Sequence, residues 1–361
     1  MDPAPGSTDV ETEDGWRRYI EQHFDTQFHE YACSYVSVLL GRGFPVIFDL
    51  RHLAGRIGVS PALLRAVVAE PKYFYREFTI PKRRGGTRQI HAPYAAVATV
   101  QAWISESILS RIDVSDRAHG FVRLRSPVTN ALEHLGARCI LRIDIKDFFP
   151  TVNLPRVIAI FQSIGYNHEA SYALARACTL DNKLPQGAST SPQLANLVAR
   201  RLDARLEALA KSLDLVYTRY ADDLVFSGAA ISLTVPNFVE RIVESEGFFV
   251  NPQKTLLARG SQRKIVTGVS VSSQVTRIPR EMRRKLRAEV HRALRDPVGS
   301  ASTSSVSGPF FDPQHLQRLL ASVAYWKHVE PTSTFAVAAH SKIKTLISEL
   351  RANIGAEPEE R

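Results

Sequence analysis

The sequence predicts an α+β protein of two or three subdomains. Stretches with apolar residues at helical spacing are interspersed with short apolar and β-branched runs that end in turn residues. A chain of 361 residues is too long for one small core. Its 44% hydrophobic and 23% charged residues are typical of a globular protein.

The first half of the chain is expected to be mainly helical, with one hairpin. Helices are expected over residues 16–70 and again over 94–111. Within the first region, Ser60 and Pro61 form a typical pair of N-cap and first-turn residue. Between the two regions, the stretches FTI and RQIHA predict strands, and the basic turn PKRRGG joins them with glycines that permit unusual backbone angles.

The second half mixes strands and helices. ARCILRIDIKDFFPTV predicts a buried strand that runs into a loop, and LVYTRYADDLVFSG predicts a strand, a turn and a strand. SPQLANLVARRLDARLEALAKS is the clearest helix, with Ser191 as its cap and Pro192 at its first position. GFFVNPQKTLLA and KIVTGVSVSS predict a turn and two further strands. A basic helix over 277–296, a Ser/Gly-rich loop and a helical region over 314–352 close the chain.

The charge balance favours a polyanionic partner. Lys and Arg number 46 against 36 acids, which gives a formal net charge of +10. Such an excess favours nucleic acid, although a merely basic protein has the same balance. The first 15 residues instead carry five acids and no base, and are expected to be a disordered tail.

The cysteines and the apolar runs limit the cellular setting. Cys33, Cys139 and Cys178 lie far apart and form no metal-binding or disulfide pattern. No apolar run is long enough to span a membrane, and the N-terminus lacks the features of a signal peptide. We therefore expect a cytoplasmic protein without structural zinc or a membrane partner.

Three carboxylates are candidates for a metal site. Asp144 ends an apolar strand, and an unpaired buried carboxylate is costly. Arg142 is expected on the opposite face of that strand. Asp222 and Asp223 stand together in a strand turn, where an isolated pair more often forms a solvated hairpin tip. If the two strands are neighbours, the three acids converge, and divalent cations would relieve their repulsion, as in two-metal phosphoryl transfer.

Other segments have chemistry that suits a nucleotide, each with a plainer alternative. The tip with Lys82 and Arg88 fits a triphosphate or is a solvated turn, and Lys254 is a proton donor or a surface lysine. Gln186 lies in LPQGASTSP, which either approaches a flat ligand or only leads into a helix. Phe148 is expected in the core, whereas Phe149 is a candidate to lie under the sugar and reject a 2′-hydroxyl by bulk.

The order of these motifs resembles that of the reverse transcriptases over residues 72–273. YADD is similar to the catalytic box of that family, and PQGASTSPQLAN to its template-and-nucleotide segment. Within the family the chain resembles the bacterial retron enzymes: Asn130, Ala131 and His134 match the NAxxH pattern, and Val266–Thr267–Gly268 match VTG. Leu124 and Ser272 depart from it, because retron enzymes often have Gly and Asn there.

The resemblance implies a right-hand polymerase with fingers, a palm with an antiparallel sheet, and a helical thumb. The expected division has a tail (1–15), an N-terminal helical region (16–70), fingers (71–125), a palm (126–275), and a thumb (276–361) whose Ser/Gly-rich loop covers 296–313. The basic helix suits a duplex backbone, or is in part a solvated face. Tyr325 and Trp326 are expected to stack on RNA or to lie in the core.

The resemblance also implies residue roles. Asp144, Asp222, Asp223 and the Ile145 carbonyl would hold two Mg²⁺ ions, or Mn²⁺, with Asp222 the more directly engaged of the pair. The remaining implied roles are nucleotide binding by Lys82, Arg88, Gln186 and the sugar-selecting Phe149, proton donation by Lys254, and RNA binding by Asn130, His134, Val266, Thr267 and Gly268.

The implied function is RNA-directed DNA synthesis from dNTPs on a cognate noncoding RNA that is both template and primer, which yields an RNA–DNA product. A role in antiphage defence with a separate effector protein follows from the same kinship. A group II intron-like or other defence-associated reverse transcriptase is the alternative with the same fold. A non-catalytic RNA-binding protein with a polymerase fold is the alternative of another class, against which the intact aspartates argue.

Overall fold

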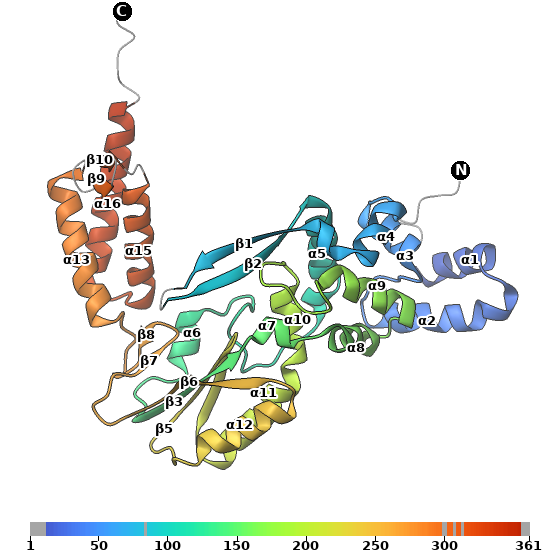
Figure 1. Ribbon diagram of the computed structural model, residues 1–361, viewed down its shortest axis with the longest axis horizontal. Helices are drawn as coiled ribbons and strands as arrows, with labels where there is room; N and C mark the ends of the chain where they lie inside the picture. Colours follow the sequence, from blue (N-terminus) through green and yellow to red (C-terminus); the bar gives the residue numbers. More distant parts are fainter. Residues whose placement is uncertain (1–11, 83–84, 298–301, 306–307, 312–313, 355–361) are drawn as a thin grey trace, which may run out of the picture.

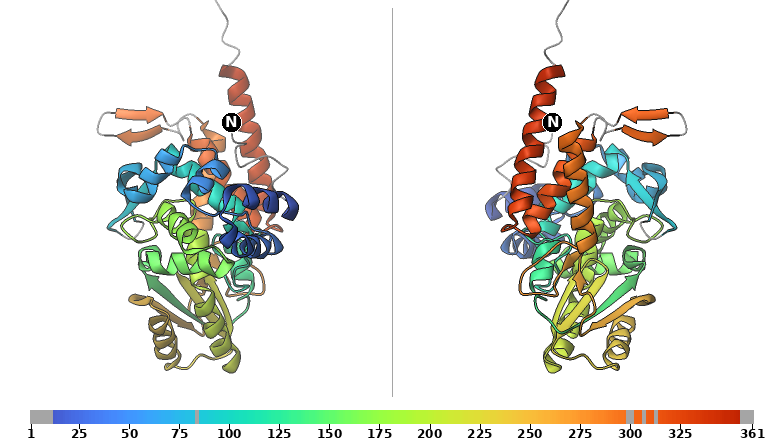
Figure 2. Two further views of the ribbon diagram at one scale, coloured as in Figure 1. Left: turned by 90° about the vertical axis from the view of Figure 1, so that its right-hand side faces the viewer. Right: turned by 90° about the vertical axis from the view of Figure 1, so that its left-hand side faces the viewer.

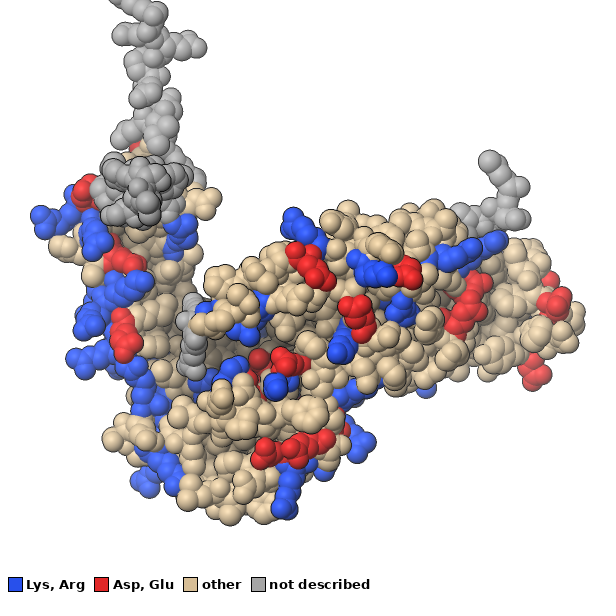
Figure 3. All heavy atoms as spheres, viewed as in Figure 1, with Lys and Arg blue, Asp and Glu red and all other residues tan. Residues whose placement is uncertain are grey.

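The computed structural model describes residues 12–82, 85–297, 302–305, 308–311 and 314–354. Figure 1 shows three parts: a long arm of helices and a hairpin, a central sheet with helices, and a separate upright bundle of C-terminal helices. A hollow lies between the bundle, the hairpin and the sheet (Figure 3). This is the right-hand polymerase arrangement of fingers, palm and thumb.

The helical start of the arm begins earlier than expected. Its helices are α1 (Glu13–His23), η2 (Thr26–Phe28), α2 (His29–Gly41), α3 (Leu50–Ile57), α4 (Pro61–Ala69) and η3 (Pro71–Phe74). The expected tail reached residue 15, but Thr12 caps α1, because its hydroxyl oxygen accepts a hydrogen bond from the Gly15 N–H at 3.1 Å. Ser60 caps α4 as expected, ahead of Pro61. The rest of the tail, residues 1–11, lies outside the described residues.

The predicted hairpin forms the inner part of the arm. β1 (Tyr75–Pro81) and β2 (Thr87–Pro93) pair antiparallel from Tyr75 opposite Pro93 to Pro81 opposite Thr87. Figure 1 shows the hairpin reaching over the palm toward the C-terminal bundle. It continues into α5 (Ala95–Ser107) and η4 (Leu109–Arg111), so the single helix expected over 94–111 has a short 3-10 turn at its end.

The palm is a four-stranded antiparallel sheet in the order β4-β5-β3-β6. One face of the sheet packs on the large core, to which Leu141, Ile143 and Ile145 of β3 belong. The other face carries Arg142 and Asp144, because successive side chains on a strand alternate between faces. The strands are β3 (Cys139–Lys146), β4 (Val216–Tyr220), β5 (Asp223–Gly228) and β6 (Phe249–Arg259).

The palm helices include one correction to the sequence analysis. The helix expected over 191–212 is two helices, α10 (Ser191–Val198) and α11 (Arg200–Ser212), separated at Ala199. Thr190 rather than Ser191 is the cap position, and the Ser191 hydroxyl instead donates to the Pro185 carbonyl at 2.8 Å. The other palm helices are α6 (Pro127–Leu132), α7 (Phe148–Thr151), α8 (Leu154–Ile164), α9 (His168–Cys178) and α12 (Val235–Ser245).

The C-terminal bundle has a core to which Leu286, Val323 and Ile343 contribute, and this core continues into the palm through Val128 and Ala131 of α6. A short turn of β7 (Ile265–Val266) and β8 (Val269–Ser270) connects the bundle to the palm. Its helices are α13 (Arg280–Arg295), α15 (His315–Val329) and α16 (Thr334–Ile354). Trp326 is buried in this core, so of its two expected settings the core is the one found.

The Ser/Gly-rich segment is not only a loop. It contains an antiparallel pair, β9 (Ser302–Ser305) and β10 (Gly308–Phe311), which Figure 2 shows projecting from the bundle. Thr303 of β9 and the Phe pair of β10 are residue types with β propensity, which the count of Ser and Gly concealed. The rest of the segment, apart from its first two residues, lies outside the described part of the chain.

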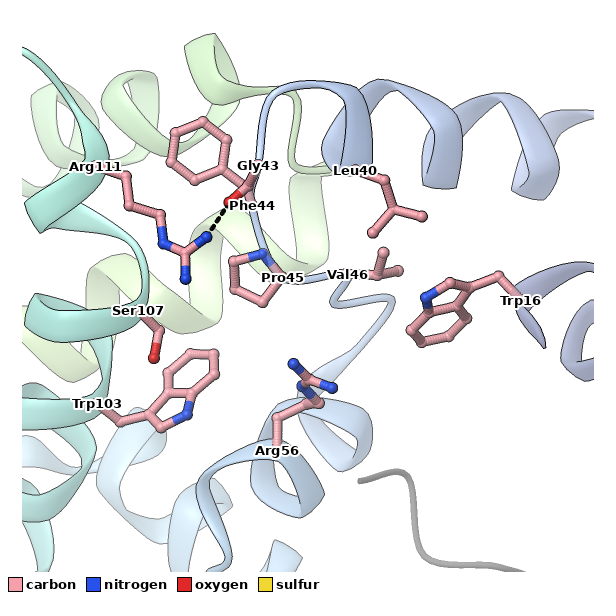
Figure 4. A pocket seen from close by; sticks show the side chains of 10 residues that line it. All are labelled: Trp16, Leu40, Gly43, Phe44, Pro45, Val46, Arg56, Trp103, Ser107 and Arg111. Carbon is pink, nitrogen blue, oxygen red and sulfur yellow. Dashed lines mark hydrogen bonds between the residues drawn. The ribbon is translucent and has the colours of Figure 1, made fainter. Parts of the chain in front are cut away.

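A small hollow lies where the N-terminal helices meet α5 (Figure 4). Trp16, Arg56 and Trp103 line it, and Arg111 donates a hydrogen bond to the Gly43 carbonyl at its edge. It contains none of the residues that the sequence predicts for the functional site. Across the described ranges, no helix is both long and apolar enough to cross a bilayer.

Candidate active site

Three aspartates meet at one end of the palm sheet. The chain turns between β4 and β5 at Ala221, whose φ of +56° lies in the left-handed region, and Asp222 and Asp223 follow this turn. Asp223 is the register partner of Asp144 on β3, and the Ile145 N–H donates to the Asp222 carbonyl at 2.8 Å. The two segments that the sequence analysis singled out are therefore adjacent strands.

Lys254 contacts Asp144 through an irregularity in β6. The pairing partner on β6 jumps from Leu256 to Asn251 while β3 advances only from Arg142 to Asp144. Such a bulge bends a strand and re-aims its side chains. The Lys254 ammonium here donates to both carboxylate oxygens of Asp144 at 2.8 Å.

Arg142 pairs with the third carboxylate. Its guanidinium lies 3.4 Å from both oxygens of Asp223. The expectation that Arg142 faces away from the acids was wrong, because residues two apart on a strand share a face. That periodicity was the signal in the sequence that would have identified Arg142 as a member of the site.

Asp222 has no such direct cationic partner among the described contacts. Burial, followed by repulsion from Asp144 and Asp223, raises the pKa of its carboxyl from 3.8 to about 6. Lys254 offsets this rise only in part. Asp222 is thus the carboxylate of the three that most requires a further cation.

The donor chemistry of these residues fits hard divalent cations. As the side chains stand, no group of three or more His, Cys, Asp or Glu within the described residues is arranged to hold a metal. Lys254 and Arg142 each pair with one of the carboxylates. Three carboxylates and two bases leave a local charge of 3 − 2 = 1 negative, carried by the partly buried Asp222. Divalent ions with oxygen ligands suit such an excess.

The PQG loop lies against the hairpin rather than free in solution. The Gln186 carbonyl accepts a hydrogen bond from the His91 N–H of β2 at 2.8 Å, and the Gln186 side chain is partly exposed. The next residue, Gly187, has a φ of +127°, and a Cβ there would lie 2.7 Å from the His91 carbonyl oxygen. Only glycine permits this approach of loop and hairpin without a shift.

We therefore predict that Gly187→Ala impairs nucleotide use. The added methyl must push the loop away from β2, at a cost of about 1–3 kcal/mol for overpacking, and the new side chain is also strained at this φ. Since Gln186 moves with the loop, we expect the KM for dNTPs to rise about tenfold or more. Steady-state kinetics measure this, and Ala188→Gly in the same loop is the control. An unchanged KM would contradict the prediction.

The remaining residues predicted to bind the nucleotide have no described hydrogen bond or ion pair with the carboxylates. Phe149 is partly buried, and its ring lies 5.6 Å from Phe148 and 6.0 Å from Phe121. Phe148 is in the core as expected. Lys82 and Arg88 are exposed on the hairpin, and among the described contacts none joins them to the acids.

Three of the five residues expected to bind RNA are buried, and two of them belong to the NAxxH pattern. Asn130 and His134 are 0% and 1% exposed, and the His134 ring nitrogens hydrogen-bond the hydroxyls of Ser227 and Thr218, each at 2.7 Å. Burial lowers the pKa of His134 to about 3, so the imidazole is neutral. His134 ties the segment after α6 to β4 and β5, and contact with RNA through these two side chains does not fit their burial.

The VTG segment forms the turn between β7 and β8. Thr267 and Gly268 have φ of +46° and +84°, and Val266 is buried. The Thr267 hydroxyl donates to the Pro127 carbonyl at 2.7 Å, which ties the turn to the first residue of α6. The two retron-like patterns, far apart in the sequence, therefore lie against each other at the junction with the bundle.

Leu124 stands on backbone that favours glycine. Its φ is +63° and its side chain is 92% exposed, a setting in which glycine, the residue that the resemblance leads us to expect here, is unstrained. Neither burial nor conformation favours leucine here. The neighbouring Arg125 holds the loop in place through hydrogen bonds to the carbonyls of Ser115, Asp116 and Ala118.

Leu124→Gly is accordingly expected to stabilise the protein. Left-handed backbone destabilises a non-glycine residue by about 1–2 kcal/mol, and glycine removes this strain. Glycine also has a greater conformational entropy in the unfolded chain, which offsets about half of the gain. We expect a gain of about 0.5–1 kcal/mol in the free energy of unfolding, measured by urea titration. Leu124→Ala, which keeps the strain, should show no such gain, and an equal gain in both variants would argue against strain as its source.

Comparison with known proteins agrees with this geometry. Residues 80–278 match the family model described as reverse transcriptase (RNA-dependent DNA polymerase). The chain is 36% identical to the Retron Ec86 reverse transcriptase of Escherichia coli, over 69% of this chain and 79% of that one. It is 36% identical to the Retron Mx65 reverse transcriptase of Myxococcus xanthus, over 77% and 71%, and 33% identical to the Retron Mx162 reverse transcriptase of the same organism, over 88% and 70%.

The fold, the paired aspartates and the family match define a reverse transcriptase, an RNA-directed DNA polymerase. The chain belongs to this family. Within it, the chain is a retron-type reverse transcriptase, because relatives above 30% identity that it covers over two thirds of their length are retron enzymes.

Proposed function

We propose that this protein copies a cognate structured noncoding RNA into single-stranded DNA, with the RNA as both template and primer. The observation that carries the catalytic part is the convergence of Asp144 with Asp222 and Asp223 on adjacent strands. We take the hairpin (within 71–125) as fingers, the sheet region (126–275) as palm and the C-terminal bundle (276–361) as thumb.

Asp144, Asp222, Asp223 and the Ile145 carbonyl would hold two Mg²⁺ ions, with Mn²⁺ as a substitute. Bound divalent ions activate the attacking hydroxyl and stabilise the charge on the leaving pyrophosphate. The protein's part is to keep three carboxylates together at the sheet end against their repulsion. Arg142 and Lys254 reduce that repulsion, since each pairs with one of the acids.

The nucleotide would lie between the hairpin and the sheet. Lys82 and Arg88 are exposed cations that suit a triphosphate, and Gln186 is held on β2 through its backbone. Phe149 would contact the sugar and reject a 2′-hydroxyl by its bulk. Its packing on Phe148 and Phe121 restricts the orientation of the ring. Lys254 would donate a proton to the leaving group.

The template–primer duplex would lie against the bundle. Helix α13 is basic, and Arg277, Arg280, Arg283, Arg284 and Arg287 line one groove along it. Figure 3 shows Lys and Arg side chains gathered along the outer edge of the bundle, on the side away from the hollow. Contacts from such a row to phosphates would give an affinity that depends strongly on salt.

Kinship supports the rest of the proposal. The relatives that are 36% identical to this chain are retron reverse transcriptases, and the NAxxH and VTG patterns are present. Priming from an internal guanosine 2′-hydroxyl, antiphage defence and a separate effector protein are proposed on this basis.

The test is to purify the protein with its bound nucleic acid after expression with the DNA that flanks its gene. RNase treatment should leave single-stranded DNA covalently joined to a short RNA remnant, detected by its mobility shift after debranching. Protein with Asp222→Ala should yield the RNA without the DNA. DNA with no linked ribonucleotide would favour a group II intron-like enzyme, and absence of DNA from both proteins would contradict the proposal.

A further inference from the structure

We infer that the buried ion pair of Arg219 and Asp203 positions the catalytic turn, so that Arg219 is a positioning residue for DNA synthesis. No motif in the sequence points to this pair, because Asp203 lies on α11 and Arg219 on β4. The inference rests on the proposed role of the turn's aspartates.

The pair itself is fully enclosed. Both side chains are 0% exposed, and the guanidinium holds the carboxylate by two hydrogen bonds, Nε to Oδ1 and Nη2 to Oδ2, each 2.7 Å long. The Tyr217 hydroxyl donates to the same carboxylate at 2.8 Å. Arg219 and Tyr217 share this face because they are two residues apart on β4.

The third nitrogen of Arg219 reaches the turn. Nη1 donates to the Ala221 carbonyl at 3.2 Å and to the Asn196 side-chain oxygen at 2.8 Å. Ala221 is the residue in left-handed conformation directly before Asp222. A non-glycine residue keeps such a conformation only where its surroundings hold it. Arg219 is the described side chain that bonds the Ala221 backbone.

Asn196 extends the support to the other side of the turn. Its amide donates to the Gly120 carbonyl at 2.8 Å. A Cβ on Gly120 would lie 2.5 Å from the Ala221 backbone nitrogen, so the loop before α6 is in close contact with the turn. The turn thus lies between the Gly120 backbone and the Arg219 guanidinium, and Asn196 links these two groups.

Arg219 also contacts the other catalytic strand. The centre of its guanidinium lies 5.6 Å from the centroid of the Phe148 ring, which follows β3 and Asp144. One side chain therefore touches both segments that carry the aspartates, together with the PQLAN helix α10 through Asn196.

Stability alone does not account for an ion pair here. Replacing a buried pair by apolar side chains of similar volume is often neutral or stabilising, because desolvating two charges is costly. Apolar side chains, however, offer no donor to the Ala221 carbonyl or to Asn196. An apolar core would lack the hydrogen bonds from Arg219 to the Ala221 carbonyl and to Asn196. We infer that these bonds determine the direction of the Asp222 and Asp223 side chains.

The test is the double variant Arg219→Met with Asp203→Leu, which removes both charges together. We expect its thermal midpoint to exceed that of Arg219→Met alone, which leaves the buried Asp203 charge unpaired, and its kcat to fall about 100-fold, the usual cost of a displacement of about 1 Å. The Mg²⁺ concentration for half-maximal rate should rise. The Kd for a primer–template duplex should not change, because Arg219 lies away from that surface.

Two controls separate positioning from simple packing and from the proposed chemistry. Tyr217→Phe removes the third donor to Asp203 but leaves the turn contacts, and should lower the thermal midpoint without changing kcat. Wild-type kcat in the double variant, with Asp222→Ala inactive in the same assay, would overturn this inference and leave the proposed function standing. Activity in Asp222→Ala would instead overturn the proposed function.

Discussion

Asp222→Asn is expected to abolish DNA synthesis while making the metal-free protein more stable. The variant loses the carboxylate that lacks a direct cationic partner, and with it several kcal/mol of transition-state stabilisation, so the rate should fall at least about 1,000-fold. Gel-based primer extension with Mg²⁺ measures the first effect. Thermal unfolding in EDTA measures the second.

The gain in stability follows from the raised pKa of Asp222. Its folded-state pKa is about 6 against an ordinary 3.8, so the folded protein binds more protons than the unfolded chain between these values. The carboxyl therefore favours folding below pH 3.8, and this contribution is lost as the pH rises through 6. Asparagine does not titrate. In EDTA the variant should match the wild type near pH 4 and exceed it by about 2 kcal/mol at pH 7.

The matched control is Asp223→Asn. Asp223 pairs with Arg142, so its replacement leaves that arginine without its carboxylate, and we expect no gain in stability. We also expect Asp223→Asn to lose less activity than Asp222→Asn, because Asp222 is the acid without a direct cationic partner among the described contacts. Equal stability of wild type and Asp222→Asn in EDTA at pH 7 would show that burial and repulsion together do not raise the pKa of Asp222.

Local patterns predicted the fold well where a segment's own sequence determines its structure. The β3 strand, the YADD turn and the hairpin at residues 75–93 are short periodic runs bounded by turn residues, and all three are present. The break at Ala199 was missed because the apolar stripe continues through it on both sides.

Pairings between distant segments were the part that could not be predicted. The ion pair of Lys254 with Asp144 depends on a bulge in β6, and the ion pair of Arg219 with Asp203 joins a strand to a helix. NAxxH matched a pattern, but only tertiary packing shows that its Asn130 and His134 are enclosed. A motif identifies residues by family, whereas burial decides whether a side chain can touch a ligand.

Lys254→Met is expected to lower the rate of nucleotide addition about 100-fold. The bulge in β6 exists at one point, between the partners of Arg142 and Asp144, and it directs this lysine at the site. General acid catalysis is worth about 10²–10⁴-fold, which sets the size of the expected loss. Single-turnover extension by one nucleotide measures the chemical step apart from product release.

Lys254→Arg separates the two roles that the geometry allows. Lys254 is 51% exposed at its side chain and donates to both oxygens of Asp144, so it either neutralises that carboxylate or transfers a proton. Arginine keeps the charge and the donors but does not give up a proton in proteins. If proton donation is the role, arginine should be as slow as methionine. If arginine instead restores the wild-type rate, Lys254 acts through charge alone, and the bulge serves to hold Asp144 in place.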